Sequence, residues 1–140
     1  KGIASGKIKT LIVYGEDVTQ HGIGVKLLGK LKTLIVSDIL PSATTKNANY
    51  LLPGCAHAEK RGTFTNVKGR VQKFSKALEP PGDAMAEWEV LHELVQNVAG
   101  LDEFDSIEGL FNQMAFEVKA FKEAGLKWDT LGDKGADVKL

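Results

Sequence analysis

The chain has 140 residues, and its balance of eighteen basic and eighteen acidic residues argues against nucleic-acid binding, which usually requires a basic surface. Its composition, 43% hydrophobic and 26% charged, fits one soluble domain with an ordinary core, and its apolar runs are far shorter than the roughly 20 residues of a membrane-spanning helix. Cys55 is the only cysteine, which excludes an internal disulfide and a cluster or zinc site built on cysteine spacing within these residues. Because the chain begins with Lys1 rather than Met, we expect a fragment of a longer polypeptide.

The pentapeptide KTLIV occurs twice, at residues 9–13 and 32–36, at an offset of 23 residues. The run 8–14 is apolar nearly throughout and rich in β-branched residues, which predicts a strand buried on both faces, as in parallel sheets. From Thr19 to Lys30 apolar residues recur every three or four positions, which predicts a short amphipathic crossover helix. The repeat therefore indicates two neighbouring parallel strands rather than a duplicated domain.

A third predicted strand follows, and after it the composition of the chain changes. Ser42 or Thr44 is expected to cap a short helix over residues 45–49, and "YLLPG" at 50–54 predicts a brief strand. From Glu59 to Phe74 glycines and polar residues dominate, which predicts an irregular, partly extended surface segment.

The last part of the chain is predicted to be helical. "EPPGD" at 79–83 predicts a stiff turn, one apolar helical face follows up to Gly100, and Asp105 with Glu108 indicates a capping box for a second helix that Gly125 would end. We expect Trp128 to anchor the remaining tail and its end to fray.

Together these elements predict an α/β fold: a parallel-sheet, Rossmann-like layer with covering helices, a polar loop segment and two C-terminal helices. We expect a single domain over 1–140, with an α/β part (1–78), a helical part (79–125) and a tail (126–140).

Most motifs that would carry chemistry are incomplete. Gly22 and Gly24 form only part of a dinucleotide fingerprint, and carboxylates precede them, which argues against a bound phosphate. The histidines do not share a metal-ligand spacing, so we expect no metal site and no catalytic residue. Cys55 is expected to be a small buried thiol rather than a nucleophile paired with His57.

Two groups of polar residues remain as candidates for a binding site. Glu16, Asp17 and Asp38 follow neighbouring strands, at the edge where open α/β sheets bind ligands, although solvated loops are also often acidic. The segment 59–70 could hold an anion or a polar ring, or its polar groups could form a network that fixes the segment to the sheet.

The stretch "LKTLIVSDILPSATTKNANYLLPGCAHAEKRGTFTNVKGRVQKF", followed by "EPPGDAMAEWEVLHEL", resembles the molybdopterin oxidoreductase family from about Ile8 to Gly100. Within the family, the segment "TNVKGRVQKF" and the short tail after the two predicted helices most resemble the large iron–sulfur subunit of the proton-pumping NADH:quinone oxidoreductase (complex I). Formate dehydrogenase is the close alternative, and a free-standing binding module is a weaker one.

The resemblance to the complex I chain implies a C-terminal scaffold domain, not itself catalytic and without its own cofactor, in an oxidoreductase chain that carries iron–sulfur clusters elsewhere. Its partners would be the other subunits of an NADH dehydrogenase, on the cytoplasmic side and peripheral to the inner membrane, with no direct membrane insertion and no nucleic acid. In the alternative, the chain forms part of the molybdopterin-binding region of a formate-dehydrogenase-like enzyme. The resemblance places these residues on the pterin side: Glu16, Asp38, Thr44, Glu59, Lys60, Gly62, Thr63, Asn66 and Arg70.

Overall fold

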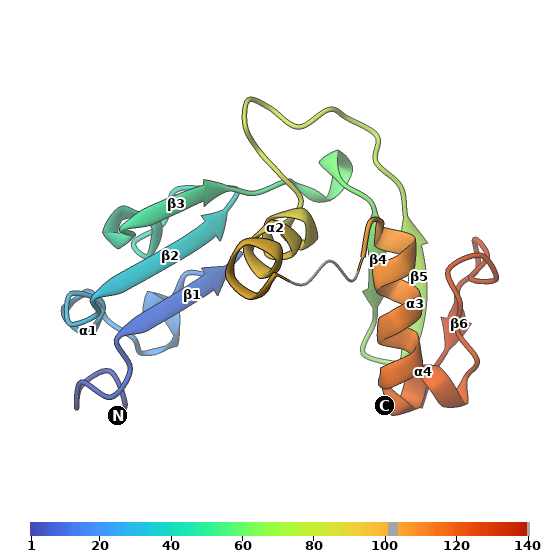
Figure 1. Ribbon diagram of the computed structural model, residues 1–140, viewed down its shortest axis with the longest axis horizontal. Coiled ribbons are helices and arrows are strands. Elements are labelled where there is room, and N and C mark those ends of the chain that lie inside the picture. Colours follow the sequence, from blue (N-terminus) through green and yellow to red (C-terminus); the bar gives the residue numbers. More distant parts are fainter. Residues whose placement is uncertain (101–103, 140) are drawn as a thin grey trace. The chain divides into compact units, whose positions relative to one another are not determined.

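The computed structural model describes residues 1–100 and 104–139 and divides the chain into two compact units (Figure 1). The first unit comprises Lys1–Ala56 and Pro80–Glu87, and the second comprises His57–Glu79 and Trp88–Leu140. Each unit has its own sheet and its own hydrophobic cluster. The predicted α/β class is confirmed.

The first unit is built on three parallel strands in the order β1-β2-β3, namely β1 (Thr10–Tyr14), β2 (Thr33–Asp38) and β3 (Tyr50–Pro53). The register pairs Thr10 with Thr33 and continues through Val13 with Val36, so the two KTLIV segments lie side by side. The prediction that the repeat marks neighbouring parallel strands is therefore confirmed.

The connections in the first unit are short helical turns. η1 (Val18–His21) and α1 (Val25–Leu28) join β1 to β2, and η2 (Thr45–Asn47) joins β2 to β3. The single helix predicted over 19–30 is therefore interrupted, because Gly22 ends η1 in the left-handed region at φ 82°.

These connections cover one face of the sheet, where Leu11, Val18, Ile23, Leu31 and Ala48 pack against a buried cluster of Val13, Leu28, Leu34 and Val36. The opposite face is different, since the side chain of Ile12 in β1 is 43% exposed. The prediction of a strand buried on both faces is thus wrong for β1 within this chain.

The second unit contains an antiparallel sheet, which replaces the irregular segment predicted for residues 59–74. After η3 (His57–Glu59), β4 (Gly62–Thr65) pairs with β5 (Arg70–Phe74), which also pairs with β6 (Ala136–Asp137).

The β4–β5 hairpin has a specific turn and a buried inner side. Asn66 Oδ1 accepts hydrogen bonds from the backbone N–H groups of Lys68 at 2.9 Å and Arg70 at 3.0 Å, and Gly69 takes φ 82°. Val71 in β5 is fully buried, so the segment contributes to the core as well as to the surface.

In the part of the chain that the structure describes, three α-helices follow residue 80: α2 (Glu87–Ala99), which begins at the last residue of the first unit, α3 (Ile107–Glu117) and α4 (Lys119–Glu123). Ser106 caps α3, because its side chain accepts a hydrogen bond from the N–H of Gly109 at 3.2 Å, one residue later than the cap predicted at Asp105. Within residues 1–100 and 104–139, no helix combines the length and the apolar character that crossing a membrane requires.

The C-terminal tail is more ordered than predicted. Leu131 and Val138 are buried in the cluster with Phe111 and Phe121, and β6 adds to the hairpin. Trp128 packs against the same cluster, as expected. The tail therefore contributes Leu131 and Val138 to the core of the second unit.

Candidate functional site

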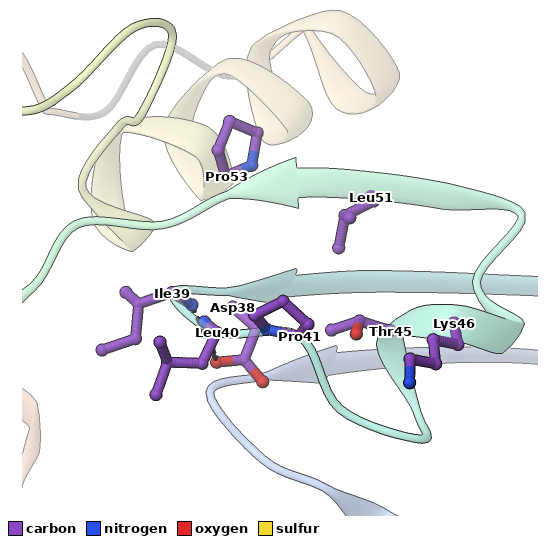
Figure 2. Close-up of a pocket in the computed structure, with 8 residues that line it drawn as sticks. All are labelled: Asp38, Ile39, Leu40, Pro41, Thr45, Lys46, Leu51 and Pro53. Carbon is purple, nitrogen blue, oxygen red and sulfur yellow. Dashed lines mark hydrogen bonds between the residues drawn. The ribbon is translucent and has the colours of Figure 1, made fainter.

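A pocket of about 540 Å³ opens at the carboxyl ends of β2 and β3, within the first unit (Figure 2). This is the edge where open α/β sheets bind their ligands. Most of its lining is apolar, with one carboxylate, one hydroxyl and one ammonium group. The pocket is lined by Asp38, Ile39, Leu40, Pro41, Thr45, Lys46, Leu51 and Pro53.

Asp38 forms the turn that follows β2. Its Oδ1 accepts a hydrogen bond from the backbone N–H of Ile39 at 2.7 Å and, more weakly, from that of Leu40 at 3.4 Å. A carboxylate has a second oxygen that can accept further hydrogen bonds. Asp38 can therefore hold the turn through Oδ1 and accept a ligand's hydrogen bond through Oδ2.

Asp17 connects the loop after β1 to the loop after β2. Its Oδ1 accepts hydrogen bonds from the hydroxyl groups of Thr44 and Thr19, each at 2.7 Å, and from the backbone N–H of Thr19 at 3.1 Å. The bond from Thr44, followed by that from Thr19, lowers the pKa of Asp17 well below its ordinary value. The carboxylate is therefore ionised throughout the neutral range.

Asp17 was expected as a carboxylate at a strand end, but the family resemblance did not place it on the pterin side. The signal that could have found it is the Asp17-x-Thr19 pattern, in which an Asp accepts a backbone N–H two residues later at a helix start. Its bond to Thr44, 27 residues away, is visible only in the structure.

The remaining first-unit candidates have different surroundings. Thr44 is fully buried by its position beneath these loops and donates to Asp17. Glu16 forms an ion pair with His21, with 3.1 Å between Oε1 and Nε2, and both side chains are more than half exposed. The N-cap of η2 is Thr44, one of the two residues expected to cap it, and Thr44 makes no side-chain cap bond. The hydroxyl of Ser42 accepts from the N–H of Thr45, the first residue of η2, at 3.1 Å.

A buried hydroxyl without a partner lies near the same end of the sheet. Ser37 in β2 is 2% exposed, and its Oγ has no hydrogen-bond partner among the residues that the structure describes. A Cβ atom on Gly54 would lie 3.3 Å from this oxygen and 3.6 Å from Oε1 of Glu87.

Glu87 also affects Tyr14, the last residue of β1. Burial raises the pKa of Tyr14, and the negative charge of Glu87 raises it further.

The other predicted site residues belong to the second unit: Glu59, Lys60, Gly62, Thr63, Asn66 and Arg70. The structure therefore distributes the predicted site over both units, with Glu16, Asp38 and Thr44 in the first.

In the second unit, Arg70 holds the tail to the hairpin. Its Nε and Nη2 donate to the two carboxylate oxygens of Asp137 at 2.8 Å and 2.6 Å, and Nη1 donates to the carbonyl of Lys134 at 3.1 Å. The hydrogen bond between the two side chains raises the pKa of Arg70 and lowers that of Asp137. With Asn66 bound to the hairpin turn, this arrangement favours the structural alternative for these two residues.

Gly62 makes room for an aromatic ring. A Cβ atom there would lie 3.1 Å from Cζ of Phe74, whose ring stacks on that of Phe64 with 4.6 Å between centroids. The ring of His57 meets Phe64 edge-on at 5.0 Å. Packing thus explains the glycine without a ligand.

Among the described residues, no three His, Cys, Asp or Glu side chains gather closely enough to hold a metal ion. Cys55 is buried, in agreement with its predicted role as a small buried thiol.

The family model described as "Molybdopterin oxidoreductase" matches residues 1–97, and the chain belongs to this family. A solved structure of acetylene hydratase from Pelobacter acetylenicus superimposes on 99% of this chain and 20% of that one, with a TM-score of 0.74 and 20% sequence identity. That likeness bears on the fold alone.

Two curated relatives are similar to this chain over nearly its whole length. The NADPH-Fe(3+) oxidoreductase subunit alpha of Geobacter sulfurreducens is 36% identical over 135 residues, covering 94% of this chain and 16% of the relative. The F420-dependent formate dehydrogenase subunit alpha of Methanocaldococcus jannaschii is 34% identical over 151 residues, covering 97% of this chain and 22% of the relative. The family expectation is confirmed, whereas these relatives do not support the narrower expectation of the large iron–sulfur subunit of complex I.

Proposed function

We propose that this chain forms part of the molybdopterin-binding region in the alpha subunit of a formate-dehydrogenase-like oxidoreductase. The observation that carries the proposal is the pocket at the carboxyl ends of β2 and β3, in a chain of the molybdopterin oxidoreductase family. The chain spans only 16% and 22% of the two relatives' lengths, so the activity belongs to the whole polypeptide.

The chemistry of the pocket fits the organic part of such a cofactor. Its volume of about 540 Å³ lies within the range of small-molecule sites, roughly 300–1,000 Å³. A pterin is a flat heterocycle with an amino group and ring N–H groups, from which the Asp38 carboxylate can accept hydrogen bonds, and Leu51 and Leu40 offer apolar walls. Lys46 supplies a positive charge for a phosphate.

The described residues offer no cluster of metal ligands, so in this proposal the chain contacts the pterin and phosphate rather than the metal. When bound, the group would supply the redox chemistry. The residues of this chain would orient it: Asp38 by accepting hydrogen bonds from its N–H groups, and Asp17 with Thr44 by fixing the two loops against each other.

The complex I interpretation remains the competing one. It places the same fold in a scaffold that surrounds no molybdenum, in a chain with iron–sulfur clusters elsewhere. The similarity to relatives named as formate dehydrogenase alpha subunits favours the molybdopterin interpretation. Other subunits of a multi-subunit oxidoreductase are the expected partners in both.

The test begins with the natural full-length polypeptide, purified under anaerobic conditions. Its molybdenum, pterin, iron and acid-labile sulfide are measured, together with formate oxidation by an artificial electron acceptor. Molybdenum with pterin supports the proposal. Iron and sulfide without molybdenum or pterin, in protein made in a host that supplies the cofactor, would reject it in favour of the scaffold.

A pair of variants then tests the pocket itself. Asp38→Asn keeps the size of the side chain but removes the charge, and we expect the full-length protein to retain about tenfold less pterin, because a hydrogen bond to a charged group contributes roughly 1.5–3 kcal/mol. Asp83→Asn, at an exposed carboxylate of the same unit outside the pocket, is the matched control. Equal pterin content in both variants would remove Asp38 from the site.

A further inference from the structure

The sequence repeat includes lysines that the sheet does not explain. It reads KxKTLIV at residues 7–13 and again at 30–36, so Lys7 matches Lys30 and Lys9 matches Lys32 at the same offset of 23 residues. Burial against the helical connections accounts for the apolar part of the repeat. The four lysines are exposed, so the core does not require them. They therefore indicate a role other than folding.

The backbone brings the matching lysines together at one end of the sheet. The carbonyl of Lys9 accepts hydrogen bonds from the N–H of Lys32 at 2.8 Å and from that of Thr33 at 3.1 Å. Lys9 and Lys32 therefore lie side by side immediately before β1 and β2, on neighbouring segments about 4.8 Å apart. Lys7 and Lys30 lie two residues earlier in the two segments.

A fifth lysine comes from the connection between these strands. Lys26 lies in the last turn of α1, four residues before Lys30. Figure 1 shows α1 and the amino-terminal turn at the end of the sheet where β1 and β2 begin. We name this group of lysines the amino-end patch: Lys7, Lys9, Lys26, Lys30 and Lys32.

The amino-end patch has no neighbouring acidic residue in its own segments. Residues 1–14 and 22–37 contain no Asp or Glu. All five lysines are exposed, and among the residues that the structure describes none of them forms an ion pair. The patch therefore concentrates five uncompensated positive charges at one end of the sheet.

The carboxylates that follow the strands lie at the opposite end. Glu16 and Asp17 come after β1, and Asp38 is the last residue of β2. At about 3.3 Å per residue, the five residues of β1 alone span roughly 17 Å. The Debye length at physiological ionic strength is about 8 Å, so these carboxylates do not neutralise the patch.

The residue type indicates what kind of partner the patch attracts. A cluster of ammonium groups attracts carboxylates and phosphates alike. Phosphate recognition favours arginine, whose planar guanidinium donates two parallel hydrogen bonds, and the first unit contains no arginine. Lysine carries a strongly hydrated point charge and is depleted in stable protein interfaces. The patch is therefore suited to an acidic protein surface that docks reversibly.

We propose that the amino-end patch docks the acidic surface of another protein through a reversible, salt-sensitive contact. In the free protein the adjacent ammonium groups of Lys9 and Lys32 repel each other, and carboxylates of the partner relieve this repulsion. The candidate pocket opens at the carboxyl ends of the strands, so docking uses none of its residues and does not depend on the proposed function.

Fluorescence anisotropy of the natural full-length protein with a labelled polyglutamate peptide tests the docking. The patch variant combines Lys7→Gln, Lys9→Gln, Lys30→Gln and Lys32→Gln. The control variant removes the same number of charges from exposed positions of the second unit, with Lys68→Gln, Lys127→Gln, Lys134→Gln and Lys139→Gln.

We expect the patch variant to bind the peptide at least about tenfold more weakly than the natural protein, and the control to bind within about twofold of it. Binding should be lost in about 1 M salt, where the Debye length is about 3 Å. Equal weakening in both variants would mean that net charge alone attracts the peptide. That result, or no binding by the natural protein, would overturn the proposal.

Two further probes separate an acidic protein from a partner that carries phosphates. They are a labelled oligothymidylate and vesicles of phosphatidylcholine with phosphatidylserine. Weaker binding of both probes than of the peptide supports the proposal. Binding of either probe that is at least as tight as that of the peptide, and that the patch variant loses, would assign the patch to nucleic acid or to a membrane surface and reject an acidic protein.

Acetylation of lysines by N-hydroxysuccinimide acetate, followed by mass spectrometry, checks the patch in the complete polypeptide. Lys9 and Lys32 should react in the free protein and react more slowly when the peptide is present, whereas Lys134 should react equally in both. If Lys9 and Lys32 do not react in the free protein, another part of the polypeptide covers the patch and the proposal is wrong. Molybdenum content of the same sample reports separately on the proposed function.

Discussion

The hydroxyl group of Thr44 donates to Oδ1 of Asp17 over 2.7 Å, and this bond joins two loops that follow neighbouring parallel strands. Thr44 is fully buried, while Asp17 begins the loop helix η1 and also binds Thr19. One oxygen atom thus sets the spacing of the loops at the carboxyl end of the sheet, where the candidate pocket opens.

Loss of the Thr44 hydroxyl should destabilise the chain. Thr44→Val keeps the shape of the side chain and removes its bond to Asp17, and we expect the free energy of unfolding to fall by about 1 kcal/mol. Urea denaturation measures the change, with Thr10→Val at an exposed position of β1 as the control. Equal stability of the two variants would show that the Thr44 bond contributes nothing.

The stability of the chain should depend on Asp17 in acid. Because its folded-state pKa lies below the unfolded value of about 3.9, the ionised carboxylate stabilises the fold above that pH, and the contribution is lost as the pH falls towards the folded-state pKa. We expect Asp17→Asn to be less stable than the natural chain at neutral pH, with a difference that shrinks below about pH 4. Denaturation curves between neutral and strongly acidic pH would disprove this if the difference stayed constant.

Gly135 should tolerate no side chain. It takes φ 71°, and an added Cβ atom would overlap the carbonyl oxygen of Val71 in β5. We expect Gly135→Ala to destabilise the second unit by at least about 2 kcal/mol, because both backbone strain and a clash with the main chain oppose it. Gly132→Ala is the control, since its Cβ would meet nothing within 4 Å and its backbone is not in the left-handed region. Thermal unfolding that ranks the two variants equally would contradict the geometry.

Ser37 and Ser42 should respond oppositely to alanine. Ser37 Oγ is buried without a partner among the described residues, so Ser37→Ala removes an uncompensated desolvation cost and should leave the stability unchanged or raise it. Ser42→Ala removes the hydroxyl that accepts from the backbone N–H of Thr45 at the start of η2, and should cost about 1 kcal/mol. A clear loss of stability in Ser37→Ala would mean that the hydroxyl has a partner in solution.

The parallel sheet could be predicted from sequence because its cause is local: two equal runs of β-branched residues separated by a crossover. The hairpin of β4 and β5 could not, because its buried residue Val71 is held by partners far along the chain, such as Phe111 and Leu131. The same holds for the tail, whose bond between Arg70 and Asp137 spans 67 positions.

In the candidate site, too, the features with a local cause could be predicted from the sequence and the long-range contacts could not. The strand ends placed Glu16, Asp17 and Asp38 at one edge of the sheet, and the family resemblance added Thr44. The hydrogen bond between Thr44 and Asp17 and the pocket wall at Leu51 required the structure. The apolar pattern of β1 predicted burial on both faces, and the exposure of Ile12 shows that this chain alone does not provide it. The predicted division into parts 1–78, 79–125 and 126–140 stays a prediction.

The first unit is discontinuous in sequence, and this has a consequence for how it forms. Met85 N–H donates to the carbonyl of Pro53 at 3.1 Å, and the bridge between Gly54 and Met85 closes the unit only after residues 57–79 have been made. During synthesis the strands β1 to β3 are therefore made first, and their unit is complete only after Pro80–Glu87 has been synthesised. A protein cut after residue 56 would keep all three strands and still lack the segment that finishes their fold.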